Sequence, residues 1–152
     1  MSSDRLKADC LTLMGDACVM SLSTCDREGA WSAPVYYIYR QNAFYFFSNP
    51  KARHVNGDAK TLCAASIFRD DARIENLCGI QMQGRILTAE PGTSSLKVAA
   101  AYCRRFAIQA GKGDLLSFFK ESFHASLYRF VPELIFFMNN AEGFGKRERV
   151  DL

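Results

Sequence analysis

A group of phosphate-binding donors is predicted in the seven residues from Ser48 to His54. The stretch has a helix-start pattern, because Ser48 or Asn49 is a suitable cap and Pro50 is favoured at the first helical position. This helix is expected to run to about Ala59. Backbone N–H groups at the start of a helix bind phosphate oxygens, and basic side chains add to that attraction. The basic side chains here are Lys51, Arg53 and His54. The alternative is an ordinary surface helix whose basic residues are solvated.

Aromatic residues just before this segment predict a wall against which a planar ring would stack. They are Trp31, Tyr36, Tyr37 and Tyr39, facing Phe44 to Phe47 across a hairpin. Packing in a barrel core is the alternative for most of them. Gln81 and Gln83 lie on the polar face of another strand, where they would either hydrogen-bond the edge of a ring or face solvent.

Several other kinds of chemistry lack their sequence signatures. The chain contains no P-loop, no G-x-G-x-x-G, no H-E-x-x-H and no Ser/His/Asp set. Its six cysteines form no C-x-x-C pair, and none has a second Cys or a His within four residues, so no metal site is expected. Proteolysis, nucleotide hydrolysis and Rossmann-type cofactor binding therefore lack support.

Alternating apolar and polar residues predict that β-strands position these side chains. Six strands are expected, over residues 17–23, 31–39, 44–47, 61–68, 78–86 and 126–138. Helices are expected over residues 3–14 and 96–106, with a helical turn over 115–119. Pro34 indicates an edge strand or a bulge, and Pro132 indicates a bulge or bend. The predicted fold is mainly β with flanking helices: a six-stranded antiparallel split β-barrel in meander order.

Length and composition favour a single domain over residues 1–152. The chain is 49% hydrophobic, but no stretch approaches the about 20 apolar residues of a membrane-spanning helix. Residues 1–7 are polar and charged, unlike a signal peptide, so a cytoplasmic location and no membrane partner are expected. The net charge of +3 is scattered, so nucleic acid is not an expected partner.

The order of elements resembles the pyridoxamine 5′-phosphate oxidase-like FMN-binding split-barrel superfamily. Three segments resemble its small bacterial YhbP-like branch: Tyr102 to Ala107, Phe130 to Asn140, and Glu142 to Lys146. The resemblance spans nearly the whole chain, from about Leu6 to Arg147. It implies a homodimer of split barrels with FMN in a groove between the subunits.

The resemblance also implies which residues hold the cofactor. Ser48 stands where the oxidases have a phosphate-binding threonine, Arg53 stands at their arginine, and His54 stands at their lysine. The basic residues of the second strand fall near Ser32 and Tyr37, and neither is basic, which removes two cations from the phosphate site. The expected cofactor-binding residues are Val35, Tyr36, Phe47, Ser48, Lys51, Arg53 and His54.

The leading hypothesis is an FMN-binding flavoprotein oxidoreductase of unknown substrate, in which Arg53 makes a bidentate contact to the phosphate. An alternative is a non-catalytic binding module for a flavin, haem or another planar ligand. In the haem version, His54, His124 or a cysteine would be the axial ligand. A third hypothesis is a structural or interaction protein with an empty groove.

Overall fold

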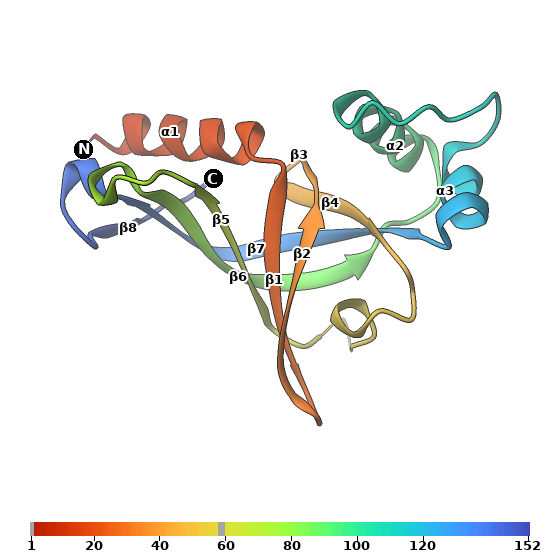
Figure 1. Ribbon diagram of the computed structural model, residues 1–152, viewed down its shortest axis with the longest axis horizontal. Helices are drawn as coiled ribbons and strands as arrows, with labels where there is room; N and C mark the ends of the chain where they lie inside the picture. The colour runs from red at the N-terminus through yellow and green to blue at the C-terminus, as the bar shows by residue number, and fades with distance from the viewer. Residues whose placement is uncertain (1, 58–59) are drawn as a thin grey trace.

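The computed structural model describes residues 2–57 and 60–152, which form a strongly curled antiparallel sheet with three helices (Figure 1). The strands are β1 (Val19–Asp26), β2 (Gly29–Tyr36), β3 (Ile38–Arg40), β4 (Ala43–Ser48), β5 (Cys63–Arg69), β6 (Cys78–Thr88), β7 (Ser126–Asn139) and β8 (Arg147–Arg149). The helices are α1 (Ser3–Asp16), α2 (Thr93–Arg105) and α3 (Leu115–Phe123). The prediction of a mainly β fold with flanking helices is confirmed.

The strand order shows how the sheet becomes a split barrel. Hydrogen-bonded neighbours follow the order β2-β1-β5-β6-β7-β4-β3, while β8 pairs with β7. The two ends of this path, β2 and β3, are separated in the chain only by Tyr37. If β2 and β3 count as one bent strand, six strands build the barrel, and the three-residue β8 is an addition that the sequence did not indicate.

The predicted meander order is wrong. β1 pairs with β5, and β4 pairs with β7, although neither pair is consecutive in the chain. Alternation along a strand fixes which side chains face the core, but it does not select the neighbouring strand. The face assignment itself is confirmed in β6, where Ile80 and Met82 are buried while Gln81 and Gln83 are exposed.

Both proline expectations are confirmed. Pro34 lies in β2, which pairs only with β1 and so ends the hydrogen-bonded path. Pro132 lies opposite Gly84, where the register of β6 and β7 shifts. A Cβ atom on Gly84 would overlap the Val131 carbonyl oxygen, so this bulge requires glycine.

The barrel core and the outer helices form two separate apolar clusters. The first joins α1 to the inner faces of the strands through Leu6, Cys10, Leu13 and Met14. α1 therefore lies across the curled sheet and covers its core (Figure 1). The second cluster packs α2 and α3 against the other face, on side chains of β3, β4 and β7. None of the described helices is long and apolar enough to cross a membrane.

Tyr37 satisfies polar groups at the bend between β2 and β3. Its side chain is fully buried, and its hydroxyl donates to the Met14 carbonyl oxygen at 2.9 Å. Its backbone N–H donates to the Cys18 carbonyl oxygen at 3.1 Å. Because the Met14 carbonyl belongs to the last turn of α1, it depends on a hydrogen-bond donor from outside the helix. The ring also packs edge-on against Phe44, with centroids 5.2 Å apart.

The Tyr37 hydroxyl is expected to stabilise the fold measurably. Tyr37→Phe leaves the Met14 carbonyl unpaired in the core and should lower the free energy of unfolding by about 1–2 kcal/mol in urea denaturation. Tyr36→Phe is the matched control, because Tyr36 is 59% exposed. The control should change stability by less than about 0.5 kcal/mol. Equal effects of the two substitutions would contradict this role.

Candidate functional site

The segment after β4 leaves the sheet by a side-chain-capped turn and does not form the expected helix. The Asn49 side chain accepts from the Lys51 N–H at 2.8 Å, and the Ala52 N–H donates to the Asn49 carbonyl at 2.9 Å. Ala52 then adopts an extended conformation, and only one 3-10 turn follows, Arg53–Val55. The predicted end of the helix, Ala59, lies outside the described residues. No helix N-terminus is therefore available at residues 49–57 to bind a phosphate.

Ser48 and His54 are hydrogen-bonded to each other. The Ser48 Oγ and His54 Nε2 atoms lie 2.9 Å apart, and the imidazole ring lies beside Phe46. Burial lowers the pKa of His54 below its ordinary value, which favours the neutral ring at pH 7. When the ring proton is on Nδ1, the Ser48 hydroxyl donates to Nε2. Ser48 and His54, both predicted to donate to a phosphate, are therefore hydrogen-bonded to each other instead.

Arg53 holds the tip of the β1–β2 hairpin. Its Nε and Nη2 atoms each donate to a carboxylate oxygen of Asp26 at 2.8 Å, and Nη2 also lies 3.2 Å from the Gly29 carbonyl oxygen. The guanidinium lies over Trp31, 5.0 Å from the ring centroid. The bidentate contact expected to a phosphate is made here to Asp26. That hydrogen-bonded pairing lowers the pKa of Asp26 to about 2.

A groove of about 780 Å³ lies between this hairpin tip and the segment after β4. We call it the hairpin groove; it is lined by residues 24–28, 51, 53–57, 61–63 and 86. Lys51, Arg53 and His54 therefore share one cavity. Its wall also carries apolar side chains, among them Leu62 and Ile86. The groove offers cationic donors beside an apolar surface.

The remaining predicted residues lie elsewhere. Val35 is buried in the barrel core, whereas Tyr36 is exposed and packs edge-on against Phe106. Phe47 faces the outer helices and stacks on Phe119, with centroids 3.6 Å apart. Ser48 touches the hairpin groove only through its bond to His54. Within one chain the seven residues do not form one site, and their contact with a cofactor stays a prediction.

The acidic hairpin residues of the groove were not expected. Asp26 and Glu28 line it, and Glu28 lies 4.0 Å from Arg53. The sequence predicted a turn at residues 25–29 and gave no signal of a partner 27 positions away. Among the described residues, no group of three or more His, Cys, Asp or Glu side chains is arranged to hold a metal ion.

Comparison with known proteins identifies the fold. No family model and no curated protein match the chain. A Listeria innocua protein described as a candidate pyridoxamine 5′-phosphate oxidase matches with a TM-score of 0.64 and 13% identity, covering 88% of this chain and 98% of that one. The chain has the pyridoxamine 5′-phosphate oxidase-like split-barrel fold.

Two further structures of similar fold are of proteins named for a ligand, haem in one case and FAD in the other. The heme storage protein HutZ from Vibrio cholerae matches with a TM-score of 0.64 and 16% identity, covering 84% of this chain and 90% of HutZ. A FAD-binding protein from Mesorhizobium loti matches with a TM-score of 0.59 and 16% identity, covering 84% of this chain and 90% of that one. At these identities the similarity shows the fold alone.

The Asp26–Arg53 pair should make stability depend on acid pH. The folded pKa of Asp26, about 2, lies below the ordinary value of 3.8. The pair therefore stabilises the fold above about pH 4, and this contribution disappears as the pH falls toward 2. Asp26→Asn should be less stable than wild type at pH 6, and the difference should narrow at pH 3 in urea denaturation. Asp70→Asn, an exposed residue outside the groove, is the control and should show no such narrowing. A difference for Asp26→Asn that is constant with pH would contradict the pairing.

Proposed function

We propose that the protein binds a flavin nucleotide, FMN in the first place, in the hairpin groove and acts as an oxidoreductase of unknown substrate. The observation that carries this proposal is the combination of cations and apolar wall in one cavity of about 780 Å³. That volume lies within the about 300–1,000 Å³ typical of cofactor sites. A flavin nucleotide presents the complementary surfaces, an apolar ring system and an anionic phosphate.

Lys51 and Arg27 are the cations best placed to receive the phosphate. Both are exposed and line the groove, and neither side chain has a carboxylate within ion-pair distance in the described part of the chain. Arg53 is already neutralised by Asp26, so its contribution is to keep the hairpin in place. When bound, the flavin would supply hydride or electron transfer, while these side chains orient it.

Haem binding is the second candidate, supported by the shared fold of HutZ. Neither histidine of this chain is well placed to be an axial ligand of haem in the groove. His54 Nε2 is held by Ser48, and that bond would have to break before Nε2 could ligate iron. His124 is exposed at the end of α3, away from the residues that line the groove. A Soret shift on haem titration would favour this candidate over the flavin.

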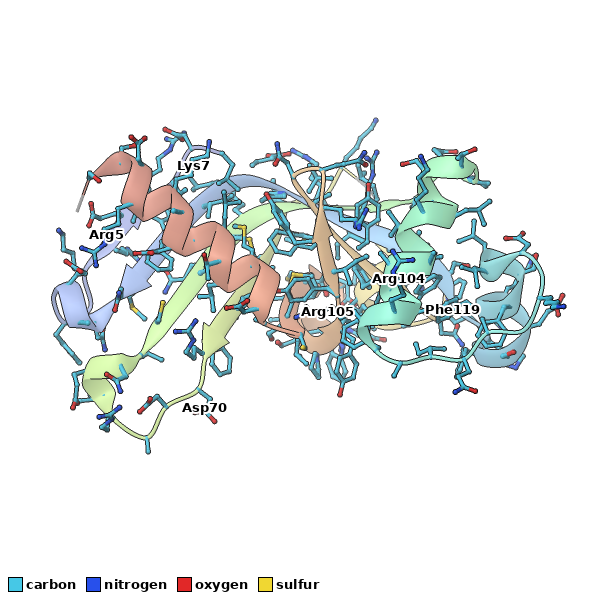
Figure 2. All side chains as sticks on the ribbon, turned by 90° about the horizontal axis from the view of Figure 1, so that it is seen from above. Arg5, Lys7, Asp70, Arg104, Arg105 and Phe119 are labelled. Carbon is cyan, nitrogen blue, oxygen red and sulfur yellow. The ribbon has the colours of Figure 1, made fainter. Side chains whose placement is uncertain are left out.

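Titration with two flavins tests the proposal. FMN should bind the purified protein with quenched fluorescence, and Lys51→Ala should weaken FMN binding about three- to tenfold, or ~0.7–1.4 kcal/mol. Riboflavin lacks the phosphate, so its affinity should be the same in both proteins. Lys7→Ala, on the exposed face of α1 (Figure 2), is the matched control and should leave both affinities unchanged. Absence of FMN binding at high micromolar concentration would refute the proposal.

We also propose a homodimer with the groove at the subunit interface. The outward face of β1, β2 and β5 carries short side chains, and exposed apolar residues lie around it. These apolar residues include Trp31, Leu62 and Phe68. A face of this kind suits close contact with the same face of a second copy.

Analytical sedimentation tests the dimer directly, because it gives the mass of the particle in solution. At micromolar concentration the protein should have a mass near that of two chains, and Ala64→Arg should reduce the mass to that of one chain. Ala64 is exposed on the outward face of β5. Ala8→Arg, on the exposed face of α1, is the matched control and should remain dimeric. A wild-type mass near one chain would reject the dimer.

A further inference from the structure

We propose that a second cavity, between the end of α1, strand β3 and α2, binds a small oxyanion: a carboxylate or phosphate group on a short apolar body. The cavity has a volume of about 190 Å³ and shares no lining residue with the hairpin groove. Two arginines, Arg40 and Arg105, are among the residues that line it. We call it the arginine pocket.

Arg105 is held in a fixed orientation at the end of α1. Its Nη2 atom donates to the Asp16 carbonyl at 2.9 Å and to the Ala17 carbonyl at 3.3 Å. The same atom lies 3.4 Å from the Cys18 sulfur. Figure 2 shows Arg105 between the C-terminal end of α1 and α2. Because all these contacts use Nη2, the Nε–H and Nη1–H donors remain for a ligand.

Arg40 supplies the second cation from the tight turn between β3 and β4. It ends β3, pairs with Ala43, and is followed by Gln41 and Asn42 with φ of 51° and 57°. Neither Arg40 nor Arg105 has a carboxylate within ion-pair distance among residues 2–57 and 60–152. The nearby Asp16 carboxylate instead lies 3.9 Å from Arg69. Two guanidinium groups without an acidic partner in one cavity would be stabilised by an oxyanion.

The volume of the pocket and the residues that line it favour a small ligand with an apolar part. At about 190 Å³ it is smaller than the about 300 Å³ minimum of typical cofactor sites, so it suits a small ion rather than a flavin. Met14, Ile38 and Ala101 add an apolar wall beside the cations. Capping of α1 alone would account for the Nη2 contacts of Arg105. It would not account for Arg40 or for the cavity.

NMR titration of the flavin-free protein tests the pocket independently of the proposed function. The probes are inorganic phosphate and propionate, each added at constant ionic strength against chloride. Saturable amide shifts are expected at Gly15, Ile38 and Ala101, which line the pocket. Saturation by phosphate alone, by propionate alone or by both supports the site and shows which oxyanion it prefers.

Two variants separate a built site from general charge attraction. Arg40→Gln should weaken the binding of the effective probe at least fivefold. Arg104→Gln, the exposed neighbour of Arg105 that does not line the pocket, should keep the affinity within twofold. The proposal is overturned if neither probe gives saturable shifts at the lining residues. It is also overturned if the two variants weaken binding equally.

Discussion

The barrel depends on one bent stretch of chain, in which Tyr37 separates β2 from β3. The sheet path begins at one of these strands and ends at the other, so the bend connects its two edges. A bend in the core exposes backbone polar groups that must be paired. Tyr37 pairs its own N–H with Cys18 and its hydroxyl with Met14, which also fixes the end of α1. One residue therefore couples barrel closure to the helix that covers the core.

Each cavity lies beside an arginine that joins two segments of the chain. Arg53 ties the tip of the β1–β2 hairpin to the segment after β4, and the hairpin groove lies between them. Arg105 caps the end of α1, and the arginine pocket lies beside it. In each place an arginine has a structural partner, while a second cation, Lys51 or Arg40, remains exposed. This division leaves the exposed cation available for the ligand that we propose for each cavity.

The sequence predicted the local features well because they depend on neighbouring residues. Side chains alternate with a period of two, so the faces of β6 could be assigned, and Pro132 predicted the bulge opposite Gly84. Strand pairing and the Asp26–Arg53 contact join distant residues, and alternation does not encode them. The helix predicted after Pro50 does not form, and the reason is local. The Asn49 side chain takes the Lys51 N–H and favours a turn.

Mapping of bound FMN by amide chemical shifts tests whether the hairpin groove holds a flavin nucleotide. If FMN binds there, saturable shifts should be concentrated at residues 24–28 and 53–57, on the two sides of the groove. Shifts on those segments should be larger than any at α3, which does not line the groove. Saturable shifts confined to α2 and α3, or no shifts at all, would show that FMN does not bind in the hairpin groove.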